Sequence, residues 1–123
     1  MNTKKPPREL VFDVLERSPC NMVQVGAVIS DRWGNFSWGR NHPVVMSNGP
    51  GGCGMCAERD AIKRANRNRL PGSTLTVAAK WRRSGNLVSR AEPCKKCMAV
   101  ILSNGIATVE FITKSGVWEV MYL

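Results

Sequence analysis

The sequence lacks the features that mark several large classes of protein. No stretch of its 123 residues approaches the roughly 18 consecutive apolar residues of a membrane-spanning helix. Residues 1–7 are basic but contain no apolar core of the kind found in a signal peptide. Internal repeats and low-complexity segments do not occur. These absences predict one cytoplasmic domain at residues 8–123, preceded by a flexible basic N-terminus at residues 1–7.

Acidic residues are scarce, with 9 against 18 basic residues and a net charge of +9. Between residues 59 and 96, eleven Lys and Arg accompany only Asp60 and Glu92. Such an excess favours contact with nucleotides or nucleic acid, although exposed basic residues also serve simply to solvate a surface. The basic candidates for a phosphate track are Arg64, Arg67, Arg69, Arg82 and Arg83. Trp33, Trp38 and Trp81 could stack on bases or pack in the core or an interface.

Histidine is almost absent, which directs the search for metal ligands to cysteine. His42 precedes a proline and has no ligand at metal-site spacing, so a place at the edge of a substrate site is favoured over metal ligation. Of the five cysteines, Cys20 stands alone and is expected to be a small buried residue. The other four form two close pairs, Cys53 with Cys56 and Cys94 with Cys97.

The apolar periodicity predicts an α/β fold. It indicates helices at residues 8–17, at residues 56–68 and from residue 94 to a cap at residues 104–105. The predicted strands are residues 22–30, 36–39, 73–81, 87–88, 106–113 and 117–123. This order predicts a three-layer α/β/α sandwich around one mixed five-stranded sheet, with residues 22–30 as an interior strand. The short turn at residues 114–116 requires the last two strands to be antiparallel. Residues 41–54 are expected to form a loop of the kind that is usually functional or mobile.

Both cysteine clusters fall at predicted helix starts, where free backbone N–H groups favour thiolates over thiols. Cys94 and Cys97 are three residues apart, so both sulfurs can face one point. With Cys56 they supply three ligands, which is the pattern of a catalytic zinc site that keeps its fourth position for water. Glu58 lies on the apolar stripe of its helix. A buried carboxylate is costly there unless it acts beside the metal-bound water as general acid and base.

The two motifs together resemble the zinc-dependent cytidine and deoxycytidylate deaminase superfamily, and most of all its small all-cysteine cytidine deaminases. The motifs are Cys56-Ala57-Glu58-Arg59-Asp60-Ala61-Ile62 and Pro93-Cys94-Lys95-Lys96-Cys97, and the resemblance extends over nearly the whole chain. It implies one Zn²⁺ per chain, held by Cys56, Cys94 and Cys97.

The resemblance also implies roles for neighbouring residues. Glu58 would take a proton from the metal-bound water and deliver it to the base and the departing ammonia. Arg59 would hydrogen-bond ligand sulfurs and offset the negative charge of three thiolates. Asn41 matches an asparagine that contacts the sugar or base, and Ala57 and His42 are further expected substrate contacts.

Two positions depart from the pattern of the nucleoside-specific members. Pro43 stands where those enzymes have a glutamate that helps to hold the ribose, and Val23 replaces a phenylalanine. The final hairpin has no room for the helix that the tRNA- and polynucleotide-editing branches insert between the last two strands. The resemblance thus implies hydrolytic deamination of cytosine to uracil in a nucleoside, a nucleotide or single-stranded nucleic acid, by a homo-oligomer.

A second interpretation remains open at this point. Cys53 could join the other three cysteines in a closed four-cysteine site. The chain would then be a non-catalytic, zinc-stabilised module that binds nucleic acid. Such a module would bind in a salt-sensitive way and would be indifferent to the loss of Glu58.

Overall fold

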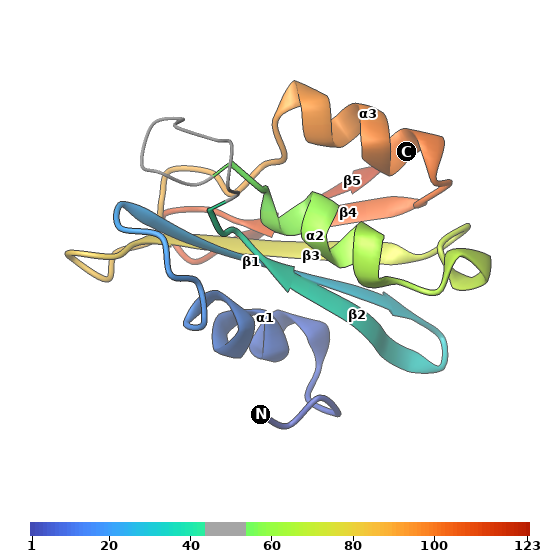
Figure 1. Ribbon diagram of the computed structural model, residues 1–123, viewed down its shortest axis with the longest axis horizontal. Helices are drawn as coiled ribbons and strands as arrows, with labels where there is room; N and C mark the ends of the chain where they lie inside the picture. The colour runs from blue at the N-terminus through green and yellow to red at the C-terminus, as the bar shows by residue number, and fades with distance from the viewer. Residues whose placement is uncertain (44–53) are drawn as a thin grey trace.

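The computed structural model describes residues 1–43 and 54–123, which form one sheet with helices on both of its faces (Figure 1). In chain order the elements are α1 (Pro7–Leu15), β1 (Val23–Asp31), β2 (Gly34–Arg40), α2 (Ala57–Arg64), the 3-10 helix η2 (Arg67–Arg69), β3 (Thr74–Trp81), α3 (Lys95–Ser103), β4 (Thr108–Ile112) and β5 (Trp118–Tyr122). No helix within the described residues is long and apolar enough to pass through a lipid bilayer.

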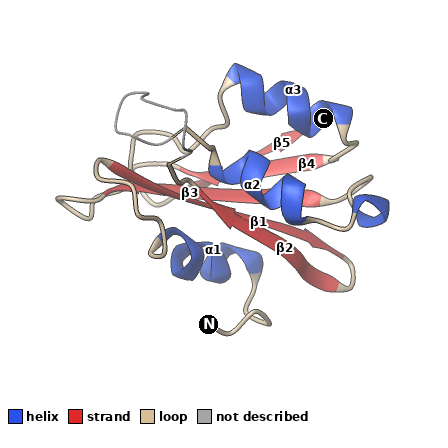
Figure 2. Cartoon of the chain, in the orientation of Figure 1, coloured by secondary structure: helices blue, strands red, loops and turns tan. Residues whose placement is uncertain are grey.

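The sheet has the strand order β2-β1-β3-β4-β5. β3 and β4 are parallel, and the other neighbouring strands are antiparallel. α1 packs on one face of the sheet, while α2 and α3 lie side by side on the other (Figure 2). The predicted three-layer sandwich with a mixed five-stranded sheet is therefore confirmed, as are the antiparallel last strands.

The helices and the interior strands bury the residues that the periodicity selects. α1 buries Leu10, Val11, Val14 and Leu15 against the sheet. The centre of β1 is buried on both faces, since Ala27, Val28 and Ile29 are all inaccessible to solvent. This pattern agrees with the predicted interior position of β1, which pairs with β2 on one side and with β3 on the other.

Two predicted elements differ in the structure. The helix expected at residues 56–68 ends at Arg64, because Ala65 adopts an extended backbone with ψ of 151°. Asn66 then caps the 3-10 helix η2 by accepting a hydrogen bond from the Asn68 backbone N–H at 3.0 Å. Short polar side chains compete with the helix for backbone groups in this way. The strand expected at residues 87–88 is only an isolated bridge between Leu87 and Lys80.

The segment that connects β2 to α2 begins and ends with a backbone pair. The N–H of His42 donates to the carbonyl of Met55 at 3.2 Å, and the N–H of Met55 donates to the carbonyl of His42 at 3.1 Å. Most of the loop predicted at residues 41–54 lies outside the described residues. The bridge nevertheless places the start of α2 beside the end of β2.

A close approach between β2 and α2 depends on Gly39. A Cβ atom at this position would lie 2.3 Å from the Ala61 nitrogen and 2.6 Å from the Ala57 oxygen. We expect Gly39→Ala to lower the free energy of unfolding by about 3 kcal/mol, because the backbones must separate to admit a methyl group. Urea denaturation would measure the change, with the exposed Ser103→Ala as control. An unchanged unfolding midpoint would contradict this account of the contact.

Candidate metal centre and catalytic cavity

Three cysteine sulfurs converge where α2 and α3 begin. Cys56 is the N-cap residue of α2, Cys94 is the N-cap residue of α3, and Cys97 lies in the first turn of α3. Their sulfur atoms all lie within 4.8 Å of one another, and those of Cys94 and Cys97 are 3.5 Å apart. Cys56 is far from Cys94 and Cys97 in the sequence. The packing of α2 beside α3 brings the three sulfur atoms together.

The spacing of these sulfurs fits a tetrahedral zinc ion. Zn–S bonds of about 2.3 Å would place the sulfurs roughly 3.8 Å apart, which lies within the observed range. Cys97 is fully buried, whereas Cys56 and Cys94 line a cavity. A catalytic zinc site needs such an opening, because its fourth ligand comes from solvent or substrate. Cys53, the candidate fourth ligand, lies outside the described residues.

The cluster favours a negative charge on Cys56. A hydrogen bond from the Cys97 thiol is the largest influence that lowers the pKa of Cys56, which falls to about 5. The Arg59 guanidinium contributes as well, with Nη2 3.9 Å from the Cys56 sulfur and 3.3 Å from the Gly54 carbonyl oxygen. The same thiol hydrogen bond raises the pKa of Cys97. The cluster is thus arranged to hold at least one thiolate beside a fixed cation.

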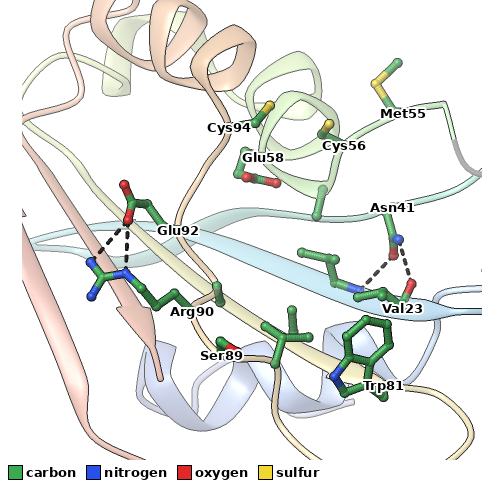
Figure 3. Close-up of a pocket in the computed structure, with 15 residues that line it drawn as sticks. Val23, Asn41, Met55, Cys56, Glu58, Trp81, Ser89, Arg90, Glu92 and Cys94 are labelled. Atoms are coloured by element: carbon green, nitrogen blue, oxygen red, sulfur yellow. Dashed lines mark hydrogen bonds and ion pairs between the residues drawn. The ribbon is translucent and has the colours of Figure 1, made fainter. Parts of the chain in front are cut away.

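Glu58 lies in the first turn of α2 with its carboxyl group at the cavity, close to Cys56 (Figure 3). The residue is only 6% exposed. Burial raises the pKa of its carboxyl to about 7, because an ionised carboxylate loses hydration there. A carboxyl group with this pKa can both accept and release a proton near neutral pH, which is the property of a general acid–base group.

The position of Arg59 leads to a prediction about pH dependence. Its charge lowers the pKa values of both Glu58 and Cys56. We expect Arg59→Gln to raise both values, so the acid limb of the kcat/KM profile should move to higher pH. Arg59→Lys keeps the charge and should move the limb less. Profiles of the zinc-loaded variants would measure the shift, and superimposable profiles for the wild type and Arg59→Gln would refute this charge effect.

The cavity beside the sulfurs has a volume of about 500 Å³, which suits a small organic ligand. Glu58, Ala57 and Asn41, all expected site residues, line it. Sequence analysis missed several further lining residues: Ser89, Arg90, Ala91 and Glu92 come from the segment before α3, and Val88 precedes them. The nearby Pro93-Cys94 motif was the available signal. Trp81, a stacking candidate in the sequence, stands at the cavity and is 45% exposed.

Asn41 is held firmly by the start of β1. Its side-chain oxygen accepts hydrogen bonds from the Val25 N–H at 2.8 Å and the Ser18 hydroxyl at 2.6 Å. Its amide nitrogen donates to the Val23 carbonyl at 2.8 Å. The second amide hydrogen has no partner within residues 1–43 and 54–123. These hydrogen bonds give Asn41 a role in fixing the cavity wall.

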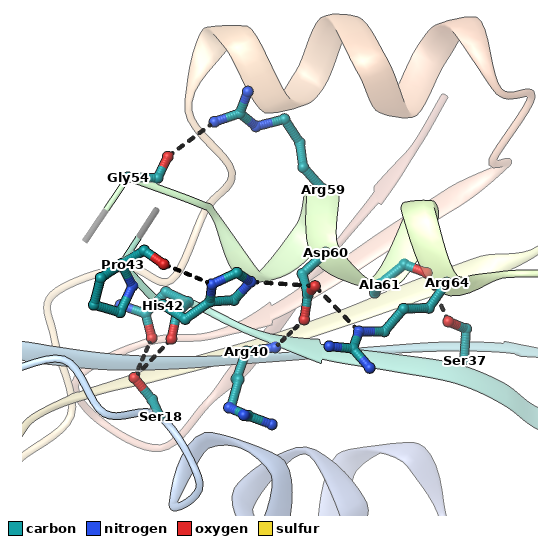
Figure 4. A network of polar contacts seen from close by, with 11 residues as sticks. Ser18, Ser37, Arg40, His42, Pro43, Gly54, Arg59, Asp60, Ala61 and Arg64 are labelled. Carbon is teal, nitrogen blue, oxygen red and sulfur yellow. Dashed lines mark hydrogen bonds and ion pairs between the residues drawn. The ribbon is translucent and has the colours of Figure 1, made fainter. Parts of the chain in front are cut away.

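His42 lies against α2 and does not line the catalytic cavity. Its Nε2 is 3.4 Å from an Asp60 carboxylate oxygen, and Asp60 also accepts from the Arg40 N–H and from Arg64 Nε, each at 3.1 Å (Figure 4). The structure brings His42 neither to the sulfur cluster nor to the cavity. Asp60 is almost wholly buried, and it ties the end of β2 to the helix that carries Glu58.

The basic residues proposed for a phosphate track are divided in the structure. Arg64 pairs with Asp60, Arg69 pairs with Asp31, and Arg82 donates to two backbone carbonyl oxygens. Arg67 and Arg83 are exposed. The tryptophans divide in a similar way, since Trp38 packs against the core while Trp33 is 72% exposed. The basic stretch thus serves partly to hold the fold together.

Three clustered cysteines and a buried carboxylate beside a cavity, on this mixed sheet, define a metal-dependent hydrolase. The comparison with protein families agrees, because the model described as the cytidine and deoxycytidylate deaminase zinc-binding region matches residues 2–113. The chain belongs to this family and is a zinc-dependent hydrolytic deaminase. The resemblance inferred from the two motifs is confirmed, and the alternative of a non-catalytic module is not supported.

Solved structures of deaminases share the fold. The cytidine deaminase from Burkholderia pseudomallei has a TM-score of 0.70 and 22% identity, over 94% of this chain and 89% of its own. The dCMP deaminase from the cyanophage S-TIM5 has a TM-score of 0.62 and 18% identity, over 84% of this chain and 76% of its own. A mutant cytidine deaminase from Mycobacterium tuberculosis has a TM-score of 0.54 and 21% identity, over 83% of this chain and 80% of its own. A comparison with curated protein sequences finds no match.

Proposed function

We propose that this deaminase acts on the cytosine base of a free nucleoside, replacing the amino group at C4 with the oxygen of water to give uracil and ammonia. The charge of the cavity favours a nucleoside over a substrate that bears a phosphate. A phosphate group requires an available cation. Among the described residues that line the cavity, Arg90 is the single Lys or Arg.

Arg90 is already neutralised by two carboxylates. Its Nη1 lies 2.7 Å from Glu119, and its Nε lies 3.2 Å from Glu92. The guanidinium also stacks over the Phe111 ring, with the carbon atom 5.0 Å from the ring centroid. Residues 44–53 add no charge, because they contain no Lys, Arg, His, Asp or Glu. The net charge of +9 therefore does not supply a phosphate site in this cavity.

The roles proposed for the catalytic residues follow from their positions. Cys56, Cys94 and Cys97 hold the zinc ion. When bound, zinc supplies a Lewis acid that lowers the pKa of water beside it. Glu58 accepts a proton from the attacking water and gives it to the ring nitrogen, where it remains. Glu58 then accepts the second proton of the same oxygen and gives it to the amino group, so that the bond between C4 and the amino nitrogen breaks and ammonia leaves. The burial of Glu58 keeps bulk water from competing for these protons.

The sugar is held by groups other than the glutamate of the nucleoside-specific enzymes, since Pro43 occupies that position. Asn41 offers an amide hydrogen, and the Glu92 carboxylate and the Ser89 hydroxyl line the same cavity. An amide hydrogen, a carboxylate and a hydroxyl can donate hydrogen bonds to the hydroxyl groups of a pentose or accept them from these groups. Ala57 is fully buried at the cavity wall and leaves space for the flat base.

The test is a substrate panel with ammonia release as the measurement. It comprises cytidine, deoxycytidine, their monophosphates and a cytosine-containing single-stranded oligonucleotide. We expect kcat/KM to be highest for the nucleosides. Glu92→Gln frees Arg90 from one carboxylate and should raise the relative rate with monophosphates, whereas the exposed Glu9→Gln should not. A wild-type preference for a monophosphate or an oligonucleotide would overturn the choice of substrate.

We also propose that the chain works as a homo-oligomer. Two large apolar side chains lie exposed near the mouth of the cavity, Met22 at 55% and Trp81 at 45%. Both line a shallow hollow next to it, and exposed apolar surface of this kind is typical of contact sites. Sedimentation velocity should show a species larger than the 13.6 kDa chain. A monomer at all concentrations at which the enzyme is active would exclude the proposal.

A further inference from the structure

A second surface of the molecule has features of a ligand site and takes no part in the proposed reaction. It surrounds Trp33, which lies in the turn between β1 and β2 and is the most exposed tryptophan, at 72%. Two hollows of about 430 and 640 Å³ flank this residue, and Ser30, Asp31 and Trp33 line both. A large aromatic ring between two hollows is a platform on which another flat ring can stack.

The backbone at Trp33 is anchored. The Trp33 backbone N–H donates to an Asp31 carboxylate oxygen at 2.9 Å, and Arg69 binds the two oxygens of the same carboxylate at 2.7 and 2.8 Å. Arg69 in turn stacks over the Phe36 ring at 4.3 Å. A tryptophan has only two rotatable side-chain bonds, so on an anchored backbone it loses little conformational entropy when a ligand binds to it.

The charges around Trp33 are mostly positive. The basic residues lining the two hollows are Lys4, Lys5, Arg32 and Arg69, and Asp31 is the single carboxylate among the lining residues. Lys5 pairs with Asp13 at 2.9 Å, so the cations without a carboxylate partner among the described residues are Lys4 and Arg32. Asp31 is committed to Arg69, and the pairing holds the pKa of its carboxyl below the ordinary value. Arg32 lies over the Trp33 ring, 4.1 Å from its centroid. One face of the ring thus carries a cation, and the surroundings attract anions.

We propose that this surface binds single-stranded nucleic acid. Exposed aromatic rings that stack bases, next to cations that follow the phosphates, are the two components of single-strand recognition. A duplex would hide its base faces from Trp33. A second copy of this chain is disfavoured because the same surface, with its excess of cations, would face itself in a symmetric contact.

The surface is separate from the catalytic cavity. Val23 lines the cavity at one end of β1, and Trp33 follows the other end. At about 3.3 Å per residue, the strand separates them by roughly 30 Å. In Figure 1 the β1–β2 turn lies at the right of the sheet, while α2 and α3 begin toward the left. Binding at Trp33 would therefore tether the enzyme to a strand without occupying its active site.

The experiment measures fluorescence anisotropy of a short labelled oligothymidine, which contains no cytosine and so cannot be a deamination substrate. We expect binding that weakens as salt rises, and an affinity loss of about tenfold for Trp33→Ala, because stacking contributes roughly 1–3 kcal/mol per base. Arg32→Glu should weaken binding and flatten its salt dependence. Tyr122→Ala, which removes another exposed aromatic side chain, and Arg17→Glu are the matched controls and should bind as the wild type does.

Other results would overturn the proposal. Absence of binding at low salt would do so, as would equal affinities for the wild type and Trp33→Ala. Preference for a duplex would exclude stacking as the mode of recognition. If Trp33→Ala instead dissociated an oligomer in sedimentation experiments, the surface would be a contact between copies. Deamination of free cytidine by Trp33→Ala reports separately on the catalytic site and should match the wild type.

Discussion

Replacing Glu58 with glutamine should lower kcat/KM by about 10²–10⁴-fold, the range over which a positioned acid–base group contributes. Glutamine fills the same space beside Cys56 but can neither take up nor release the transferred proton. Zinc content, measured by atomic absorption, should remain that of the wild type, since Glu58 is not one of the clustered sulfur ligands. Glu9→Gln, an exposed substitution on α1, is the control. Activity that survives in Glu58→Gln would remove Glu58 from the mechanism.

The same substitution should make the fold more stable at neutral and higher pH. Burial raises the pKa of Glu58 from 4.5 to about 7, so the folded chain binds this proton more tightly than the unfolded chain does. The stabilising effect of the proton is complete below pH 4.5 and is lost as the pH rises to about 7. Above that pH, the free energy of unfolding of Glu58→Gln should exceed that of the wild type by about 3 kcal/mol.

Urea denaturation of the metal-free proteins across this pH range would measure that difference. The curves of wild type and Glu58→Gln should separate as the pH rises, while the curves of wild type and Glu9→Gln should stay together. Parallel curves for Glu58→Gln and the wild type would mean that burial does not disfavour the ionised carboxylate. The expected combination of higher stability and lost activity is the usual sign that a strained group is kept for function.

Replacing Cys97 with serine should abolish zinc binding and with it the activity. Cys97 is fully buried and contacts both other ligand sulfurs, and zinc sites of this kind are built from cysteine sulfur and not from serine oxygen. We expect the zinc affinity to fall more than about 100-fold, because loss of a direct ligand exceeds the effect of losing a supporting residue. Competition with a chromophoric chelator would measure it. A variant that retains one zinc per chain would exclude Cys97 as a ligand.

Cys53→Ser is the matched comparison, because it tests whether a fourth cysteine completes the site. A three-cysteine catalytic site should keep its zinc in this variant. Spectroscopy of the cobalt-substituted wild-type protein gives an independent answer, since the intensity of the sulfur-to-metal bands reports the number of thiolates. Bands typical of four thiolates, together with loss of zinc from Cys53→Ser, would indicate a closed site without an open position for water.

The parts of the site that could be predicted are those set by short-range spacing. Cys94 and Cys97 meet because they lie on one helical turn, and Glu58 faces the cavity because it shares the apolar stripe of α2. The turn at residues 114–116 is too short for anything but an antiparallel hairpin. In each case the sequence distance itself fixes the geometry, so a single sequence is enough.

The parts that could not be predicted depend on contacts between distant segments. Arg90 is neutralised partly by Glu119, which is brought near it by the pairing of β4 with β5. The orientation of His42 is determined by Asp60, and no local pattern reveals that pairing. A count of basic residues does not reveal that the one arginine lining the cavity is paired with carboxylates, and the place of His42 in a loop does not reveal that its side chain turns toward Asp60.

The early end of α2 has a consequence for how the chain can vary in length. The first turn of α2 carries Glu58, while Arg69, in the 3-10 helix that follows, holds Asp31 at the opposite end of the sheet. The extended residue Ala65 divides these two functions. An insertion at Ala65 would change the orientation of the 3-10 helix and separate Arg69 from Asp31, which anchors the backbone at Trp33. Glu58, in the first turn of α2, would keep its position. An insertion within α2, before Arg64, would instead disturb both the helix that carries Glu58 and the pair of Arg69 with Asp31. We therefore expect homologous chains to differ in length after Arg64 rather than before it.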